Sequence, residues 1–141
     1  MRLGHRLSLA VLLVCIAPFT SALSPDDFKG LWITTERDGV LEFKSCPNVP
    51  ESLCGSVVWD KDANTSHSTC GIQIAQLSRY DGEAWRDGWV YDPRDRKKYK
   101  GSLRVKSGEL HIRAFLGAEI LGQTERLQRV ASLPSLPVCN P

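Results

Sequence analysis

The sequence predicts an all-β fold, an eight-stranded antiparallel up-and-down barrel, and three observations support this prediction. Apolar and polar residues alternate with a period of two along most of the chain after residue 22, as in strands with one buried face. Dipeptides that favour tight turns, Asp38-Gly39, Asp81-Gly82 and Ser107-Gly108, separate several of these runs. The connections are short and no crossover is evident, so closure into a barrel would leave no exposed edge. A two-sheet sandwich is the structural alternative.

The first 22 residues have the layout of a secretory signal peptide. Arg2 and Arg6 form a positive n-region, an apolar run covers residues 7–17, and residues 20–22 supply a small-residue cleavage site. The apolar run is shorter than the roughly 20 residues that a membrane-spanning helix needs, so an uncleaved anchor is the less favoured alternative. We therefore expect a secreted or periplasmic protein in which residues 23–141 form a single β-barrel domain with a Pro-rich C-terminal tail.

Removal of this segment leaves a domain without net charge. Of the 18 lysines and arginines in the chain, two belong to residues 1–22, so the remaining 16 balance the 16 aspartates and glutamates. Nucleic acid is therefore not expected as a partner, because proteins that bind it present an excess of positive charge. No later segment is long and apolar enough to predict a transmembrane helix.

Eight segments carry the strand pattern in the part of the chain after residue 22. In order, they are residues 31–36, 40–45, 55–60, 71–79, 84–91, 98–106, 109–116 and 120–130. Each is bounded by glycine, proline, asparagine, aspartate or serine, the residues that favour turns. The segments follow one another closely enough for each to pair with the next in an antiparallel sheet.

The turn dipeptides also predict which side chains share a face. A two-residue loop at Ser107-Gly108 places four apolar side chains inward: Leu103, Val105, Leu110 and Ile112. The same register turns three polar side chains outward: Arg104, His111 and Arg113. A loop at Asp38-Gly39 brings another set onto one face: Trp32, Thr34, Leu41 and Phe43. The apolar residues around Asp81-Gly82 align less cleanly, and we expect a β-bulge there.

Four cysteines follow the predicted signal peptide: Cys46, Cys54, Cys70 and Cys139. An even number in an exported chain predicts disulfides. We expect Cys46 to pair with Cys54, because a short turn-rich loop separates them, which leaves Cys70 to pair with Cys139. The chain-entropy model gives about 2.5 kcal/mol for the short loop and about 4 kcal/mol for the long one. The alternative, a metal site built from Cys46, Cys54, His67 and Cys70, does not fit the usual paired ligand spacing, so no metal is expected.

Five residues are candidates for contact with a ligand. Trp32 and Phe43 would line a cavity if the barrel interior were open, although such aromatic side chains also fill packed cores. Tyr91 and Tyr99 flank an aspartate-proline pair and would offer phenol groups to a polar ligand, whereas the alternative is an ordinary proline turn. Arg113 is either a guanidinium that meets an anionic headgroup or a simple surface arginine.

The segment around the aspartate-proline pair is also locally basic. Its cationic residues are Arg94, Arg96, Lys97, Lys98, Lys100, Arg104 and Lys106. Such a cluster can attract an anionic surface at a cell envelope, while the simpler interpretation is a solvated loop and strand face. No nucleophile motif accompanies His67 or His111, so we expect no catalytic residue, no cofactor and no enzymatic activity.

Several of these residues stand in an order that resembles a known family. They are Gly30-Leu31-Trp32, Cys46, Cys54-Gly55, Val58-Trp59, Trp85, Gly88, residues 90–93, Tyr99, residues 110–117, Leu121-Gly122 and Arg129-Val130. The pattern is similar to the small exported bacterial proteins grouped as domain of unknown function 2147 (DUF2147). The resemblance implies a lipocalin-like barrel in which a late arginine caps the tryptophan at the closed end. It implies no activity, because the family has none assigned.

The chain departs from the family pattern at three places. The segment after Trp59 is short and has Thr65 where proline is expected, Arg96 replaces a turn glycine, and Leu127 replaces an aromatic residue. Together, these observations predict an exported lipocalin-like barrel that binds a small apolar or amphipathic ligand. The alternative is a protein-binding envelope adaptor or inhibitor that acts through its loops and a basic face.

Overall fold

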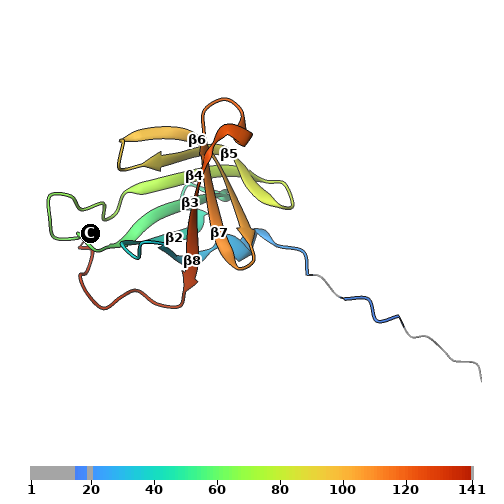
Figure 1. Cartoon of the computed structure of the whole chain (residues 1–141), viewed down its shortest axis with the longest axis horizontal. Coiled ribbons are helices and arrows are strands. Elements are labelled where there is room, and N and C mark those ends of the chain that lie inside the picture. The colour runs from blue at the N-terminus through green and yellow to red at the C-terminus, as the bar shows by residue number, and fades with distance from the viewer. Residues whose placement is uncertain (1–14, 19–20, 141) are drawn as a thin grey trace, which may run out of the picture.

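Alternating inward and outward side chains build strands that close into an antiparallel barrel in the order in which they follow along the chain (Figure 1). The computed structural model describes residues 15–18 and 21–140. Its strands are β1 Gly30–Thr34, β2 Gly39–Cys46, β3 Val49–Asp60, β4 Gln73–Tyr80, β5 Ala84–Asp92, β6 Lys97–Lys106, β7 Glu109–Phe115 and β8 Gln123–Val130. Short 3₁₀ helices precede β1 (η1, Pro25–Phe28) and β8 (η2, Glu119–Leu121). The predicted eight-stranded up-and-down barrel is confirmed, and the sandwich alternative is not, because β8 pairs with β1.

The residues before η1 bear on the predicted signal peptide. Most of residues 1–22 lie outside the described residues, so that prediction is not tested. Among the described residues, no helix is long and apolar enough to cross a bilayer.

One predicted loop is wrong: the chain between the first two cysteines of the barrel is mostly strand. β3 begins at Val49 instead of residue 55, and Val49 pairs with Cys46 across a two-residue turn. The register then shifts before Leu53 pairs with Ser45. Pro50 lies in this shift, where its missing N–H interrupts no regular ladder. The Cys46–Cys54 disulfide, with 5.0 Å between the Cα atoms, therefore closes a hairpin.

The predicted faces are confirmed at both hairpins, but the two-residue turn is confirmed only at Ser107-Gly108, because residues 35–38 connect β1 to β2. Leu103 pairs with Ile112 across the β6–β7 hairpin, and Trp32 pairs with Leu41 across the β1–β2 hairpin. Ser107 and Gly108 both have positive φ angles, 51° and 78°, as a type I′ hairpin turn requires. The bulge expected at the β4–β5 turn lies elsewhere: the β4–β5 register runs without a shift, whereas β5 and β6 shift between Trp85 and Gly88.

Packed apolar side chains fill the end of the barrel that η1 covers. The fully buried side chains include Phe28, Trp32, Phe43, Leu53, Leu77, Leu103, Leu110 and Leu127, each at most 1% exposed. A side chain with no exposed surface adjoins no space large enough for water, so this end of the barrel is solid. The strand directions place the β1–β2, β3–β4, β5–β6 and β7–β8 connections at the other end, which we call the mouth.

A second apolar cluster lies on the outer surface of the barrel. Ile33, Val40 and Trp59 point outward by register but are at most 6% exposed, and Val130 packs against them. The C-terminal tail leaves β8 at Val130 and returns to the β3–β4 loop, where Cys139 is bonded to Cys70 with 5.5 Å between the Cα atoms (Figure 1). We infer that the tail, held at both ends, helps to cover this cluster.

Candidate functional site

The structure places Trp32 and Phe43, two of the predicted ligand contacts, in the packed end of the barrel. The Trp32 indole N–H donates a hydrogen bond to the Phe28 carbonyl oxygen at 2.9 Å, and the Arg129 guanidinium carbon lies 4.1 Å from the indole centroid. Phe43 packs on Gly55, where an added Cβ would come within 2.5 Å of the phenyl ring. The arginine cap implied by the family resemblance is therefore present, and both aromatic residues belong to the packed end and not to the mouth.

The two predicted tyrosines lie on opposite faces of the sheet. Tyr99 pairs with Val90 on the inner face, near the mouth, and packs against the core. Its hydroxyl group donates a hydrogen bond to the Asp95 carboxylate, which raises the pKa of Tyr99. Tyr91, one position along the alternation, faces outward and pairs with Lys98. Of the two, Tyr99 alone belongs to the barrel mouth.

Arg113 lies on the outer face and holds the connection between β7 and β8. Its guanidinium group donates hydrogen bonds to the carbonyl oxygens of Glu119 and Ile120, both at 2.7 Å, and to the Thr124 hydroxyl at 2.8 Å. The residue predicted as either a headgroup contact or a surface arginine thus fixes the shape of a loop. Arg113 therefore lies on the opposite face of the sheet from Tyr99, which faces inward.

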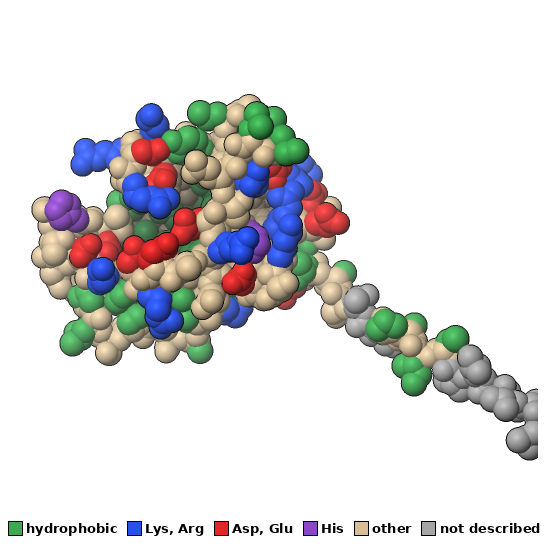
Figure 2. All heavy atoms as spheres, viewed as in Figure 1, with side chains coloured by type: hydrophobic (Ala, Val, Ile, Leu, Met, Phe, Trp, Pro, Cys, Tyr) green, Lys and Arg blue, Asp and Glu red, His purple; other side chains and the backbone are tan. Residues whose placement is uncertain are grey.

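The inner face near the mouth has apolar walls that remain partly exposed. Leu41, Ile72, Tyr99 and Ala114 pack on the core without being fully buried. Ile112, on the same face as Ala114, is 8% exposed. Figure 2 shows a hollow in this side of the molecule, with acidic side chains along one edge and basic side chains close by. A small apolar group can therefore reach the walls of the barrel without disturbing its packed end.

Charged side chains surround this apolar surface. Glu125 of β8 pairs with Ile112 and so faces inward, with its side chain 37% exposed. Arg94, in the β5–β6 turn, forms two hydrogen bonds at 3.0 Å to the carboxylate oxygens of Asp92. The nearest guanidinium nitrogen of Arg94 is 3.8 Å from a carboxylate oxygen of Glu125. The single arginine is thus shared between two carboxylates and bonded closely to one.

Burial has the largest influence on the pKa of Glu125, and nearby charges modify it. Burial raises the pKa of Glu125, Arg94 opposes this rise, and the carboxylates of Glu36, Asp38 and Asp92 add to it. The pKa of Asp92 is instead lowered, chiefly by its hydrogen bonds from Arg94. The mouth therefore holds a carboxyl group that is easier to protonate than usual, with three other carboxylates and one arginine nearby.

Sequence reasoning missed Glu125, although the signal was present. Glu125 alternates with Leu127 and Arg129 in β8, and the pairing of Leu110 with Leu127 shows that this face points inward. A carboxylate on the inward face of a predicted barrel strand is unusual, because charged residues are rarely buried without partners. The inward face of β8 could have been assigned from the capping role implied for a late arginine.

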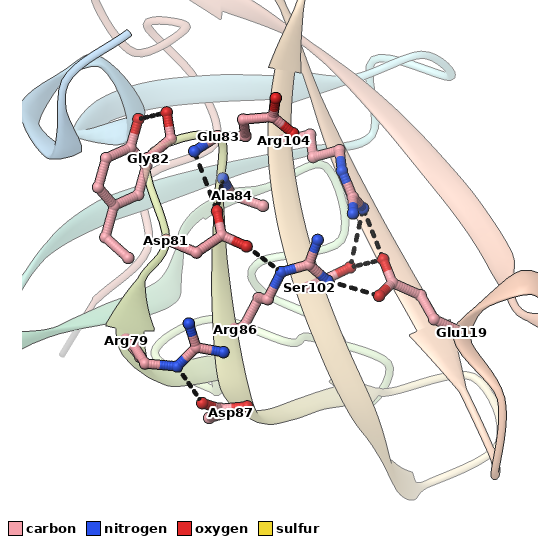
Figure 3. Close-up of polar contacts among 11 residues, drawn as sticks. Arg79, Asp81, Gly82, Glu83, Ala84, Arg86, Asp87, Ser102, Arg104 and Glu119 are labelled. Atoms are coloured by element: carbon pink, nitrogen blue, oxygen red, sulfur yellow. Dashed lines mark hydrogen bonds and ion pairs between the residues drawn. The ribbon is translucent and has the colours of Figure 1, made fainter.

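A second polar cluster lies outside the barrel, where the Glu119 side chain of η2 reaches side chains of β5 and β6 (Figure 3). The Glu119 carboxylate accepts hydrogen bonds from Arg86 at 2.6 Å, Arg104 at 2.5 Å and the Ser102 hydroxyl at 2.7 Å. Arg86 also donates to Asp81 in the β4–β5 turn. Burial alone would raise the pKa of Glu119, but the hydrogen bonds from Arg104 and Ser102 outweigh it and lower the pKa to about 2. We call Arg86, Ser102, Arg104 and Glu119 the outer network.

We expect Glu119→Gln to destabilise the protein by about 2 kcal/mol at neutral pH, because an amide cannot balance two guanidinium charges. The pKa of Glu119 falls from 4.5 to about 2 on folding. Its contribution is therefore complete above pH 4.5 and disappears as the pH drops from there towards 2. Urea unfolding at several pH values should show the difference between parent and variant shrinking on acidification. Glu109→Gln on the neighbouring strand should change stability by less than about 0.5 kcal/mol, and an equal effect of both changes would contradict this role.

All four cysteines of the barrel domain are joined in the predicted pairs, Cys46–Cys54 and Cys70–Cys139. Three of the four ligands of the alternative metal site, Cys46, Cys54 and Cys70, are therefore in disulfide bonds. Among the described residues, no group of three or more histidine, cysteine, aspartate and glutamate side chains is arranged to hold a metal ion. In the part of the chain that the structure describes, the hydrogen bonds join the side chains of neither His67 nor His111 to a hydroxyl or thiol group.

Comparison with known proteins gives a family model and a solved structure. Residues 30–129 match the model described as "Uncharacterized protein conserved in bacteria (DUF2147)", a span that includes Trp32, Glu125 and Arg129. Protein HP1028 from the human pathogen Helicobacter pylori, which is described as belonging to the lipocalin family, superposes with a TM-score of 0.54 at 14% sequence identity. The match covers 74% of this chain and 83% of that chain. At this identity the likeness shows the fold alone, and no curated protein matches the chain.

Proposed function

Since the chain belongs to the DUF2147 family of uncharacterized bacterial proteins, we propose that its lipocalin-like barrel binds a small, partly apolar ligand at the mouth. Eight-stranded barrels hold either packed side chains or one small ligand. In this chain the packed side chains occupy the end closed by η1, which leaves the mouth for a ligand. The observation that carries the proposal is Glu125, a half-buried carboxylate on the inner wall, which pairs with the apolar Ile112.

Ionisation of Glu125 lowers the stability of the folded barrel. Its pKa is raised on folding, so the folded state favours the neutral acid. Any stability gained in this way is present below the pKa of the unfolded chain and is lost as the pH rises through the folded pKa. A concave surface that keeps such a carboxyl group is a common mark of a binding site. We infer that Glu125 contacts a ligand, which would account for a carboxyl group whose ionisation is unfavourable in the folded state.

The surroundings of Glu125 define the chemical class of the ligand. The partly exposed side chains of Leu41 and Ala114, with the nearly buried Ile112 beside them, would contact an apolar body of modest size. The carboxylates that raise the pKa of Glu125 favour a head that is cationic or donates hydrogen bonds. We therefore propose an amphipathic ligand with an amine, ammonium or hydroxyl head, held at the mouth and not deep inside the barrel.

A binding experiment with short-chain amphiphiles tests this proposal. Octyltrimethylammonium, octyl glucoside and octanoate share an apolar chain and differ in their heads. By isothermal titration calorimetry, we expect the cationic probe to bind most tightly and octanoate least. Glu125→Gln should weaken binding of octyltrimethylammonium about fivefold, because the interaction of one half-exposed charge pair is lost. Binding of this probe should also strengthen as the pH rises through the raised pKa of Glu125, where the carboxylate forms.

Glu109→Gln provides the matched control for charge. Glu109 lies at the start of β7, at the opposite end of the strand from the mouth, so its replacement should leave binding unchanged. Equal weakening by the two variants would indicate a general effect of net charge and would argue against the mouth site. Equal affinity for all three probes would contradict the proposal that the carboxylates at the mouth favour a cationic head.

We infer export to an oxidising compartment, the periplasm or the cell exterior, which is supported by the two disulfides and by the signal-like sequence of residues 1–22. We also propose a binding protein and not an enzyme, since the chemistry assigned to Glu125 is recognition of a head group. An envelope adaptor, the alternative function, would act through the loops and the basic outer face.

A further inference from the structure

We propose that the β7–β8 loop and the adjacent outer face of the barrel dock the protein onto an anionic lipid bilayer. The loop, residues 116–122, carries three aliphatic side chains that are largely exposed: Leu116 at 73%, Ile120 at 83% and Leu121 at 81%. Figure 2 shows apolar side chains gathered at the upper end of the molecule, where Figure 1 places this loop. We call these three residues the apolar tip. A bilayer can bury all three, because they project together from one loop.

The outer face beside the apolar tip is basic. The outward positions of β6, β7 and β8 hold six cations: Lys98, Lys100, Arg104, Lys106, Arg113 and Arg126. The carboxylates on this face and in the loop are Glu109 and Glu119. The outer face therefore has an excess of positive charge although the barrel domain as a whole is balanced. Charge of this sign complements phosphate groups at the surface of an anionic bilayer.

The loop is also held in a fixed position relative to the basic face. Arg113 bonds to the Glu119 and Ile120 carbonyl oxygens, and Arg86 and Arg104 bond to the Glu119 carboxylate. These contacts have two consequences for docking. The apolar tip needs little further ordering to insert, and the acidic residue of the loop is neutralised before it approaches an anionic surface.

A cleft between the loop and the sheet supplies a place for a headgroup. Its volume is about 350 Å³, and it is lined by Arg104, Lys106, His111, Arg113, Glu119, Ile120 and Thr124. The lining joins basic groups with Ile120 of the apolar tip, so one amphipathic molecule can contact both. We favour a bilayer over a protein partner because the apolar residues stand on a projecting loop and not on a flat patch, and basic side chains lie behind them.

Sedimentation with lipid vesicles tests the proposal. The protein should bind vesicles of phosphatidylcholine mixed with phosphatidylglycerol, bind pure phosphatidylcholine much more weakly, and dissociate from the mixed vesicles at high salt. Ile120→Ser and Leu121→Ser should each weaken binding about tenfold, the effect of no longer burying one large aliphatic side chain. Leu136→Ser is the matched control, because Leu136 is 75% exposed but lies in the C-terminal tail.

Several outcomes would overturn the proposal. Among them are failure to bind the mixed vesicles, equal binding to both vesicle types, and loss of binding in Leu136→Ser equal to that in Leu121→Ser. The protein could instead fail to bind vesicles and capture an envelope protein, with capture lost in Ile120→Ser and Leu121→Ser. That result would show that the apolar tip binds a protein and not a lipid surface. Because the changed side chains are exposed, unfolding curves of the variants should match the parent and exclude misfolding as the cause.

Discussion

Replacing Trp32 with alanine should destabilise the barrel by about 4 kcal/mol, which is the typical cost of removing a fully buried tryptophan. Trp32 has no exposed surface, and its indole group bonds to Phe28 and lies beneath Arg129. Its removal leaves a cavity at the closed end of the barrel and takes away the N–H donor to the Phe28 carbonyl. A domain of this size has a total stability of about 5–15 kcal/mol, so the loss is a large fraction of it.

Urea unfolding measures this effect, and two variants make the result specific. Trp32→Phe keeps an aromatic ring but loses the N–H donor, so it should cost about 1–2 kcal/mol. Trp89→Ala removes a half-buried tryptophan that faces outward beneath Lys98, and it should cost clearly less than Trp32→Ala. Equal costs at Trp32 and Trp89 would show that the closed end is not the packed centre of the fold.

Removing the Cys70–Cys139 disulfide should destabilise the protein by about 4 kcal/mol. The two cysteines are 69 residues apart, so their bond strongly restricts the unfolded chain. Loss of the bond also frees the end of the tail that we infer covers Ile33, Val40 and Trp59. The Cys70→Ala and Cys139→Ala double variant should therefore unfold at much lower urea concentration than the parent, and protection of β1 and β2 amides from hydrogen exchange should decrease.

The second disulfide gives the matched comparison. Cys46 and Cys54 are only 8 residues apart, and removal of their bond should cost about 2.5 kcal/mol. Both double variants are compared with the parent under non-reducing conditions. A smaller cost for the long-range bond than for the short-range one would contradict the proposed role of the tail.

The barrel could be predicted from sequence because its determining features are local. Alternation assigns the faces of each strand, and Ser107-Gly108 sets the register of the hairpin that it joins. The start of β3 was misplaced, since the strand continues through a bulge and a proline that normally indicate a loop. The pairing of the cysteines followed from their spacing, and the structure confirms it.

The candidate site was only partly accessible to the same reasoning. Alternation of apolar and polar residues places Trp32 and Tyr99 on the same face of the sheet. It does not show that η1 seals the end of the barrel where Trp32 lies, or that the mouth near Tyr99 stays open. The outer network was missed because Glu119 and Arg86 are 33 residues apart and meet only after η2 folds over the sheet. Contacts of this kind depend on loop geometry, which residue periodicity does not encode.

The most direct test of the proposed mouth site is an NMR titration of the protein with octyltrimethylammonium. Saturable changes in amide chemical shifts are predicted for Tyr99, Ala114 and Glu125, which face inward near the mouth. The shifts of His111, which faces outward, and of Trp32, in the packed end, should change little. Changes confined to the outer face or to the packed end, or the absence of saturable changes at the mouth, would contradict the proposal.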